Sequence, residues 1–374
     1  MDNNHSKSPL SGKKIAMFVL YAIIAVFLFI TVLSFNDIDE IIAQLKNADF
    51  KYILCAAGTT LVYLALYPLS LCILARAKQC RAKSSVTYSI AMTEPFFNGI
   101  TPLATGGQPF QAHQFSRAKV KLADSTGLLL ANLLIYMLVT TGFSLTGLFF
   151  FDELTAYIDK GWIPVIIIGY SLNFSVLVIE IILGTSKTVR KWIVKFIYWL
   201  CKFRMFKKLE PKAEEFAVYL EQVQDAFKLL IRKKKYFITA IITKILSFAF
   251  LYASSYFILL ALNVEIEPYF FLALCGTSFA ITGVGFIPTP GGSGAVEGST
   301  AQVFKSIIMW VSGGTVIVSG AAAIAGGVMM IWRLLSYYMV MLISLGFYIG
   351  LEIYFKKRKN AEIAEESTEN ITEE

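Results

Sequence analysis

The sequence is poor in the residues on which most hydrolases and metal sites depend. Its 374 residues include two histidines, His5 and His113, and His5 lies in a polar N-terminal stretch. A Ser-His-Asp triad or a histidine-ligated zinc ion would have to use His113, which disfavours both kinds of chemistry. The five cysteines are scattered and form no C-x-x-C pair, so they predict neither a disulfide framework nor a zinc site.

Sequence motifs of ATP-driven transport and of hydrolysis are also missing. The chain has no P-loop and no H-E-x-x-H stretch, and "GGSGA" (Gly291–Ala295) falls short of the G-x-S-x-G elbow of hydrolases. We therefore expect no catalytic residue, no bound metal and no cofactor.

Charge is scarce as well. Only 16% of the residues are charged and 56% are hydrophobic, with a mean hydropathy of +0.63. A soluble domain would carry about a quarter charged residues. Several apolar windows reach about 20 residues, the length that crosses a hydrocarbon core. The composition predicts an all-α polytopic membrane protein with roughly six to eight transmembrane helices.

Hydropathy and charge divide the chain into a transmembrane domain (15–355) between two tails. The N-terminal tail (1–14) is cytoplasmic, the segment 184–236 is a basic amphipathic cytoplasmic loop, and we expect the polar tail 356–374 to be disordered. The predicted spans are Ile15–Phe35, Tyr52–Leu74, Ala123–Phe151, Trp162–Leu183, Phe237–Leu262 and Val316–Phe355.

Positive loop charges indicate the cytoplasmic side of a cell membrane. Lys13 and Lys14 place the N-terminus inside, and we expect the protein in the plasma membrane. The last apolar stretch contains Arg333 and allows two topologies. Two spans divided at Arg333 would put Lys356–Lys359 outside, whereas one long kinked helix puts them in the cytoplasm. We favour the single helix, with both termini cytoplasmic.

The loop Lys187–Lys235 interleaves lysines with Trp192, Phe196 and Trp199 and divides at Pro211. Two amphipathic helices of this kind suit the anionic inner leaflet of the membrane. Contact with tRNA would need the same charges and is the alternative.

Proline and glycine break two apolar segments. "TPLATGG" (Thr101–Gly107) and "IPTPGG" (Ile287–Gly292) each place a Gly-Gly pair a few residues after a proline. The flanking charges predict re-entrant elements that dip in from opposite sides, in an inverted-repeat arrangement. Paired interruptions of this kind indicate a midplane transport site, where half-helix ends favour an anion. The alternative is a kink for helix packing, with Gly294 and Gly298 as a small-residue contact face.

Four charged residues lie in or beside these apolar segments. Arg333 at mid-bilayer would cost about 2.5–3.5 kcal/mol without a partner, and a lipid phosphate suits its guanidinium; alternatively it snorkels at an interface. Glu297 is either stabilised by a helix N-terminus or acts as counter-ion to Arg333 or proton carrier. Glu94 has the corresponding place in the first broken segment, and Lys244 is interpreted as snorkelling. Four polar side chains after the first break would bind a headgroup or form a solvated face: Gln108, Gln111, His113 and Gln114.

These stretches resemble the lysylphosphatidylglycerol synthase transmembrane family, also called the flippase-like domain family. The resemblance rests on "TPLATGGQPFQ" (Thr101–Gln111), "PTPGGSGAVEGS" (Pro288–Ser299) and "WRLLSYY" (Trp332–Tyr338), and extends over Ile15–Phe355. It implies a domain that moves aminoacylated phosphatidylglycerol to the outer leaflet, which lowers susceptibility to cationic antibiotic peptides. Gln108 stands where the family often has an acidic residue, so headgroup preference would differ. The substrate-binding residues that the resemblance implies are Arg333, Glu297, Pro288, Pro290, Gly291, Gly292, Thr101, Pro102, Gly106, Gly107 and Gln108, to which we add Gln111 and Glu94.

The leading hypothesis is a flippase-like translocase for an anionic or aminoacylated phospholipid, such as phosphatidylglycerol or a derivative, or for a lipid-linked headgroup. One alternative is a phosphatidylglycerol lysyltransferase. Because the chain ends about twenty residues after its last span, lysyl transfer would need a separate aminoacyltransferase. A second alternative is a membrane scaffold without transport. Small residues such as Ala322 and Gly326 would permit a homodimer.

Overall fold

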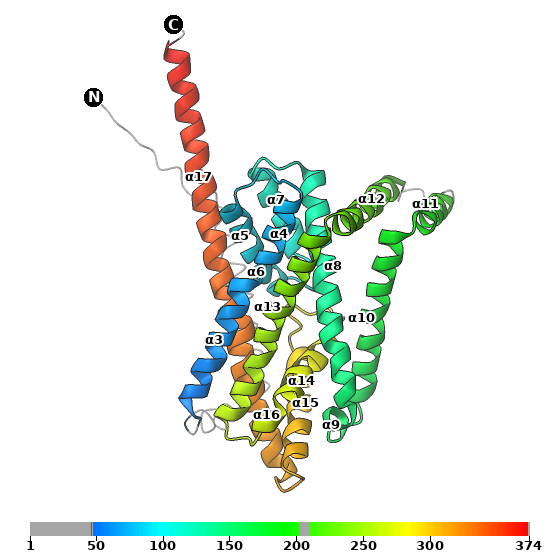
Figure 1. Ribbon diagram of the computed structural model, residues 1–374, viewed down its shortest axis with the longest axis vertical. Coiled ribbons are helices and arrows are strands. Elements are labelled where there is room, and N and C mark those ends of the chain that lie inside the picture. The colour runs from blue at the N-terminus through cyan, green and yellow to red at the C-terminus, as the bar shows by residue number, and fades with distance from the viewer. Residues whose placement is uncertain (1–45, 47, 202–209, 373–374) are drawn as a thin grey trace, which may run out of the picture.

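The computed structural model describes residues 46, 48–201 and 210–372. Its named elements are all helical, which confirms the predicted all-α class (Figure 1). The α-helices are α3 (Phe50–Leu66), α4 (Leu69–Ala77), α5 (Ser84–Met92), α6 (Glu94–Gly99), α7 (Gly107–Arg117), α8 (Leu122–Thr146), α9 (Phe151–Thr155), α10 (Trp162–Thr185), α11 (Lys187–Cys201), α12 (Glu210–Arg232), α13 (Lys234–Ala261), α14 (Phe270–Thr282), α15 (Ala295–Val311), α16 (Val318–Arg333) and α17 (Val340–Thr372). Short 3₁₀ segments η1 (Gly147–Phe150) and η3 (Glu267–Tyr269) precede α9 and α14, and the π-helical segment η4 (Leu334–Met339) joins α16 to α17.

Among the described residues, five helical stretches are long and apolar enough to cross a membrane. They are Phe50–Ala77, Leu122–Thr155, Trp162–Thr185, Lys234–Ala261 and Val318–Ala361. Each corresponds to one predicted span, because an apolar run of this length satisfies its backbone groups only as a helix. The first predicted span, Ile15–Phe35, lies outside the described residues. The chain is therefore a multi-pass membrane protein.

Helix α13 connects the two halves of the hydrophobic core. Near its middle, Phe248 packs with Tyr63 of α3 and Tyr67 in one large cluster. Farther along α13, Ile258 belongs to a second cluster that gathers α14, α15 and α16. Helix α14 contributes to both clusters, and a third, smaller cluster packs Phe96 and Phe97 of α6 against Tyr338.

The broken elements enter the helical body from opposite ends (Figure 1). The first consists of α5, α6 and α7 at the end where α11 and α12 lie, and the second consists of α14 and α15 at the other end. Leu103 and Ala104 take left-handed φ angles of 55° and 52° in the first break. Such angles are unusual for residues with a Cβ atom, so the surrounding structure must hold this turn in place.

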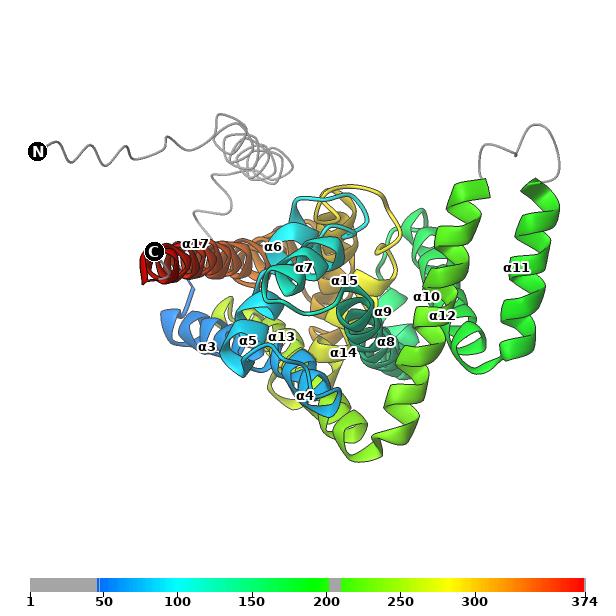
Figure 2. The same cartoon turned by 90° about the horizontal axis from the view of Figure 1, so that it is seen from above.

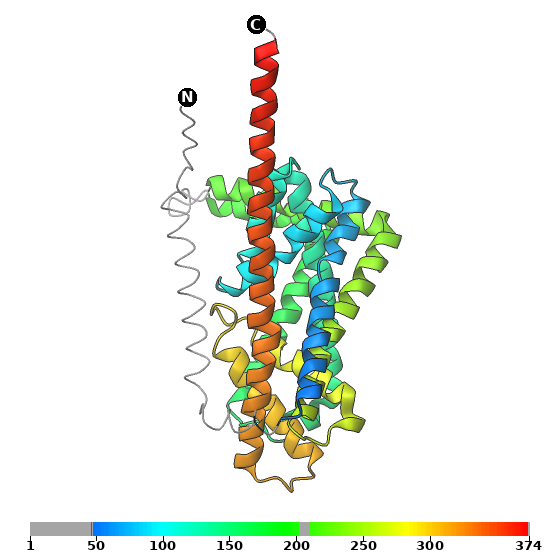
Figure 3. The ribbon, with the colours of Figure 1, turned by 90° about the vertical axis from the view of Figure 1, so that its left-hand side faces the viewer.

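The last crossing is a single helix, as predicted. The π-helical segment η4 continues α16 into α17, and the stretch Val318–Ala361 runs without interruption along the whole bundle (Figure 3). Directly after Arg333 the helix takes π-helical geometry, and the kink stays a prediction. The alternative topology, two spans divided at Arg333, is wrong.

The C-terminal tail differs from its prediction. Residues 356–374 were expected to be disordered, but α17 continues to Thr372. The tail consists largely of alanine, glutamate and lysine, which are strong helix formers, and it extends a helix that is already nucleated.

The basic loop forms two helices, as predicted. Helices α11 and α12 lie to one side of the bundle (Figure 2), and the residues between them, 202–209, are outside the described part. Pro211 stands in the first turn of α12, where a missing N–H does no harm. Trp192 of α11 is 76% exposed, which suits contact with a lipid leaflet. That contact stays a prediction.

Candidate functional site

The two breaks meet in space. Pro102 in the first loop and Pro290 in the second form an antiparallel β-bridge, an isolated one that belongs to no strand. At membrane depth, non-helical chain is stable only where protein buries it or where it lines a water-filled cavity. The contact between these two loops, which are far apart in the sequence, is therefore part of the fold.

A buried ion pair lies at this meeting point. The guanidinium Nε of Arg333 donates a hydrogen bond to Glu297 Oε1 at 2.7 Å, and Nη2 lies 2.7 Å from the same oxygen. Each side chain is only 4% exposed. Glu297 is therefore the counter-ion of Arg333 and also lies in the first turn of α15, so both structural alternatives for it hold, and Arg333 does not snorkel.

The ion pair also satisfies backbone groups that the second break sets free. Glu297 lies in the first turn of α15, and its Oε2 accepts a hydrogen bond from the N–H of Gly294 at 2.7 Å. Arg333 Nη2 donates to the carbonyl of Gly291 at 3.1 Å. Both glycines have positive φ angles, 61° at Gly291 and 85° at Gly294, which residues with a Cβ atom rarely adopt. The glycine-rich sequence is therefore needed to bring this loop under the arginine.

Tyr337 links this pair to the first broken element. Its ring lies under the guanidinium of Arg333, with 4.3 Å between Cζ and the ring centroid. Its hydroxyl donates a hydrogen bond to the carbonyl of Gly99 at the end of α6, at 2.9 Å. Through Arg333 and Tyr337, one helix thus contacts both breaks. The sequence analysis quoted Tyr337 in a motif without assigning it a role.

The first break is closed by its own side chains. The N–H of Gly106 donates to Thr101 Oγ1, and the N–H of Gly107 donates to Asn98 Oδ1, both at 2.9 Å. A Cβ atom on Gly106 would lie 2.6 Å from Thr101 Cγ2, so this approach requires glycine. These two N–H groups near the start of α7, expected to face an anion, have partners already. An anion could reach them only by displacing Thr101 and Asn98.

Comparison with known proteins identifies the family. The sequence pattern of the lysylphosphatidylglycerol synthase TM region matches residues 17–344, which include both breaks and Arg333. The chain belongs to this family. It is also similar to a UPF0104 membrane protein of Methanothermobacter thermautotrophicus (strain Delta H), with 24% identity over 335 residues that cover 87% of this chain and 92% of that protein.

In this family member, two predicted site residues lie in a separate polar cluster. Gln111 Nε2 donates to Glu94 Oε2 at 3.3 Å, and both side chains are buried. Lys244 lies over the ring of Tyr67 at 3.8 Å from its centroid and donates to the Tyr67 carbonyl. Because α13 packs along α3 and α4, Lys244 is only 1% exposed, so its interpretation as a snorkelling residue is wrong.

The remaining predicted site residues differ in their exposure. Pro102 and Pro288 are exposed, whereas Gln108 and Gly292 are partly buried, and Gly292 has a φ of 68°. Gly298 fits the predicted small-residue contact face, because a Cβ atom there would lie 2.4 Å from the ring of Trp162. Gly294 does not, because a Cβ atom there would meet nothing within 4 Å.

Another ion pair holds α15 toward its C-terminal end. Lys305 Nζ and Gln302 Nε2 each donate to a carboxylate oxygen of Asp159 at 2.7 Å. The hydrogen bond from Lys305, followed by that from Gln302, lowers the pKa of Asp159 below its ordinary value of 3.8. Asp159 lies in the turn between α9 and α10, outside the spans.

We expect a small acid-sensitive contribution of Asp159 to stability. A depressed pKa means that this contribution is present above about pH 4 and disappears as the pH falls through the lower, folded-state pKa. The exposed carboxylate is well screened by water, so the effect should be below about 1 kcal/mol. Unfolding midpoints of the parent and of Asp159→Asn should therefore differ at pH 7 and converge as the pH falls below the folded-state pKa of Asp159. An equal difference at both pH values would contradict this assignment.

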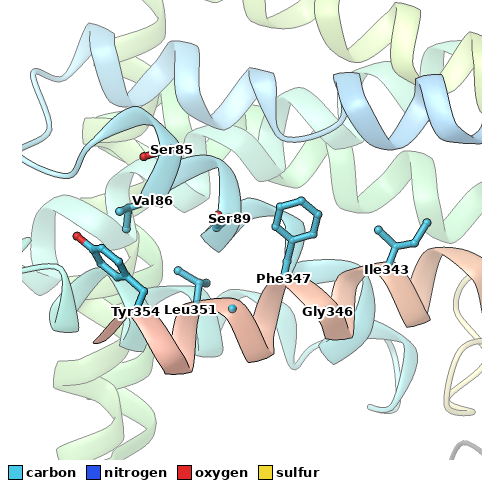
Figure 4. A pocket seen from close by; sticks show the side chains of 9 residues that line it. Ser85, Val86, Ser89, Ile343, Gly346, Phe347, Leu351 and Tyr354 are labelled. Carbon is cyan, nitrogen blue, oxygen red and sulfur yellow. The ribbon is translucent and has the colours of Figure 1, made fainter. Parts of the chain in front are cut away.

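An apolar cavity of about 390 Å³ lies between α5 and α17, beside the first break. Ser85, Val86 and Ser89 of α5 face Phe347 and Leu351 of α17 across it (Figure 4). Because most of its lining is apolar, it offers room for hydrocarbon rather than for a charged group.

Proposed function

We propose that this protein is a flippase-like translocase that moves an anionic or aminoacylated phospholipid, or a lipid-linked headgroup, between leaflets. The observation that carries the proposal is the meeting of two oppositely directed broken elements at the buried Arg333–Glu297 pair. Interrupted helices that enter from both sides and meet at a charged site are the arrangement by which transporters bind polar cargo near the midplane. Burying two charges costs desolvation free energy, and apolar side chains would fill the same space without that cost.

The arginine has binding capacity left. Guanidinium carries five N–H donors, and the contacts of Arg333 use Nε and Nη2. Within the described part of the chain, Nη1 has no hydrogen-bond partner. Three buried polar atoms in or next to the site also lack one there: Thr289 Oγ1, Trp332 Nε1 and Ser336 Oγ. Unpartnered buried donors are the groups that a phosphate and its ester oxygens would satisfy.

Leaflet exchange in liposomes tests the proposal. The purified protein is reconstituted with fluorescent phosphatidylglycerol, lysyl-phosphatidylglycerol or phosphatidylcholine, and a reagent that cannot cross the membrane bleaches the outer leaflet. We expect faster exchange of at least one of the first two lipids than in protein-free liposomes. Exchange no faster than that background for every lipid would contradict a translocase. Transfer of label from lysyl-tRNA to phosphatidylglycerol would instead establish the lysyltransferase alternative.

We also propose a plasma-membrane orientation with both termini in the cytoplasm. Lys191 on α11 and Lys357 on α17 belong to the basic end of the bundle, whereas Asp152 belongs to the acidic end. In a background with Cys55→Ser, we expect an impermeant thiol reagent to label Asp152→Cys in intact cells. Lys191→Cys and Lys357→Cys should react only after permeabilisation. Labelling of Lys357→Cys in intact cells would overturn this orientation.

A further inference from the structure

A second cavity, of about 300 Å³, lies at the basic end of the bundle, away from the Arg333 site. It is formed by the α4–α5 turn, the α7–α8 turn and the first turns of α8. Figure 1 shows both turns at the end where α11 and α12 lie. The residues that line it include four cations and one carboxylate: Lys78, Arg81, Lys119, Lys121 and Asp124.

The cavity has a net positive charge. Lys78 Nζ lies 3.1 Å from Asp124 Oδ1 and donates to the Asp124 carbonyl at 2.9 Å, so these two charges offset each other. Arg81 and Lys121 form no ion pair with any residue in the described ranges. Together they place two positive charges beside one small space. Like charges repel, so a fold that gathers them is stabilised by an anion.

Its other walls suit an anion at a membrane surface. Val120 and Leu128 are buried and give the cavity an apolar base, next to spans that begin or end there. Lys121 is the N-cap of α8 and makes no side-chain capping bond, so the first N–H groups of that helix are not capped from this position. The size admits one phosphate ester and excludes a nucleic acid, whose contacts extend over many phosphates.

The position of the cavity connects it to the transport elements. One of its turns comes directly before α5 and the other directly after α7, so together they enclose both ends of the first broken element. Both turns close in the same way: Gln79 and Lys119 have φ angles of 55° and 63° after the last residues of α4 and α7. A ligand held by both turns would fix the two ends of that element relative to α8.

We propose that this cavity binds the phosphate group of a phosphate ester, at a site distinct from the Arg333–Glu297 pair. Arg81 and Lys121 bind the phosphate oxygens, and the Lys78–Asp124 pair forms one wall. The ester is either an anionic phospholipid of the inner leaflet or a soluble phosphate; the two sources share the recognised group. This inference goes beyond the proposed function, because the bound group is held and not moved.

Binding to the full-length protein in detergent tests the site, with two probes. One probe is short-chain phosphatidylglycerol, compared with phosphatidylcholine, and the other is glycerol 1-phosphate. We expect Arg81→Gln/Lys121→Gln to weaken binding of the preferred probe by about tenfold or more, because two charge-assisted hydrogen bonds are lost. Arg81→Lys/Lys121→Arg, which keeps both charges, should retain most of the affinity. Preference for the lipid or for the soluble ester identifies the source.

The matched control removes two exposed charges elsewhere at the same end, in Lys234→Gln/Lys235→Gln at the start of α13. This control should bind like the parent, and all variants should unfold at similar temperatures. The site does not exist if neither probe binds the parent, if Arg81→Gln/Lys121→Gln binds equally well, or if the control loses as much affinity. Because binding is measured without transport, a failed translocase proposal would leave this result unaffected.

Discussion

Neutralising both members of the buried pair, in the double variant Glu297→Gln/Arg333→Gln, should abolish lipid exchange while the protein still folds. Removing Arg333 alone leaves the Glu297 carboxylate buried without a counter-charge, which destabilises a protein by about 3–5 kcal/mol. Two amides can hydrogen-bond to each other and to the Gly291 carbonyl, so the double variant should recover most of that loss. It retains no positive charge for a phosphate.

The measurement is a double-mutant cycle read in two ways. Thermal unfolding of the parent, the two single variants and the double variant gives the coupling between Glu297 and Arg333, and liposome exchange rates give their role in transport. We expect stability to recover in the double variant and transport to stay absent. If the double variant exchanges lipid as fast as the parent, the pair is structural and the headgroup binds elsewhere.

Gly291→Ala should cause the second-largest loss, because it disturbs the loop and Tyr337 together. A Cβ atom at this position would lie 2.2 Å from the Tyr337 hydroxyl oxygen, and the φ of 61° already disfavours alanine. The backbone strain costs about 1–3 kcal/mol. Displacing Tyr337 would in addition remove its hydrogen bond to Gly99, which connects the two broken elements. We expect lower stability and little exchange activity.

Gly294→Ala is the matched control for this variant. Its φ of 85° and ψ of −49° disfavour alanine at least as strongly, but a Cβ atom there would meet nothing within 4 Å. The difference between the two variants therefore isolates the contact with Tyr337. We expect Gly294→Ala to retain substantially more exchange activity. Equal losses would indicate that loop strain alone, and no link through Tyr337, explains both.

Much of the fold could be predicted because hydropathy and charge act over long stretches of chain. The spans after the first follow from apolar length, and the single final helix follows from the charge of Lys356–Lys359. The Arg333–Glu297 pair could also be anticipated, since each ion in an apolar segment requires a partner and few candidates exist. That argument needs only the cost of an isolated charge, with no knowledge of packing.

The contacts between distant elements could not be predicted in the same way. The hydrogen bond from Tyr337 to Gly99 depends on how α17 packs against α6, and one sequence shows no signal for such packing. Lys244 was misassigned because its place near a span end suggested access to water, whereas α3 and α4 cover it. The Thr101 and Asn98 caps were missed because each reaches a backbone group several residues along the chain. For Lys244, the sequence did contain one clue: a charged residue within a span usually faces the protein interior.

The wide turn η4 between α16 and α17 has one further consequence. A π turn holds one residue more than an α turn, and each residue of an α-helix corresponds to a rotation of about 100°. If the six residues Leu334–Met339 rewound as α-helix, every side chain on α17 would swing around its axis by that angle relative to Arg333. Tyr337 would then lose its hydrogen bond to the Gly99 carbonyl, and the helix would no longer contact both breaks. The π-helical segment directly after Arg333 therefore sets which face α17 turns toward the first break.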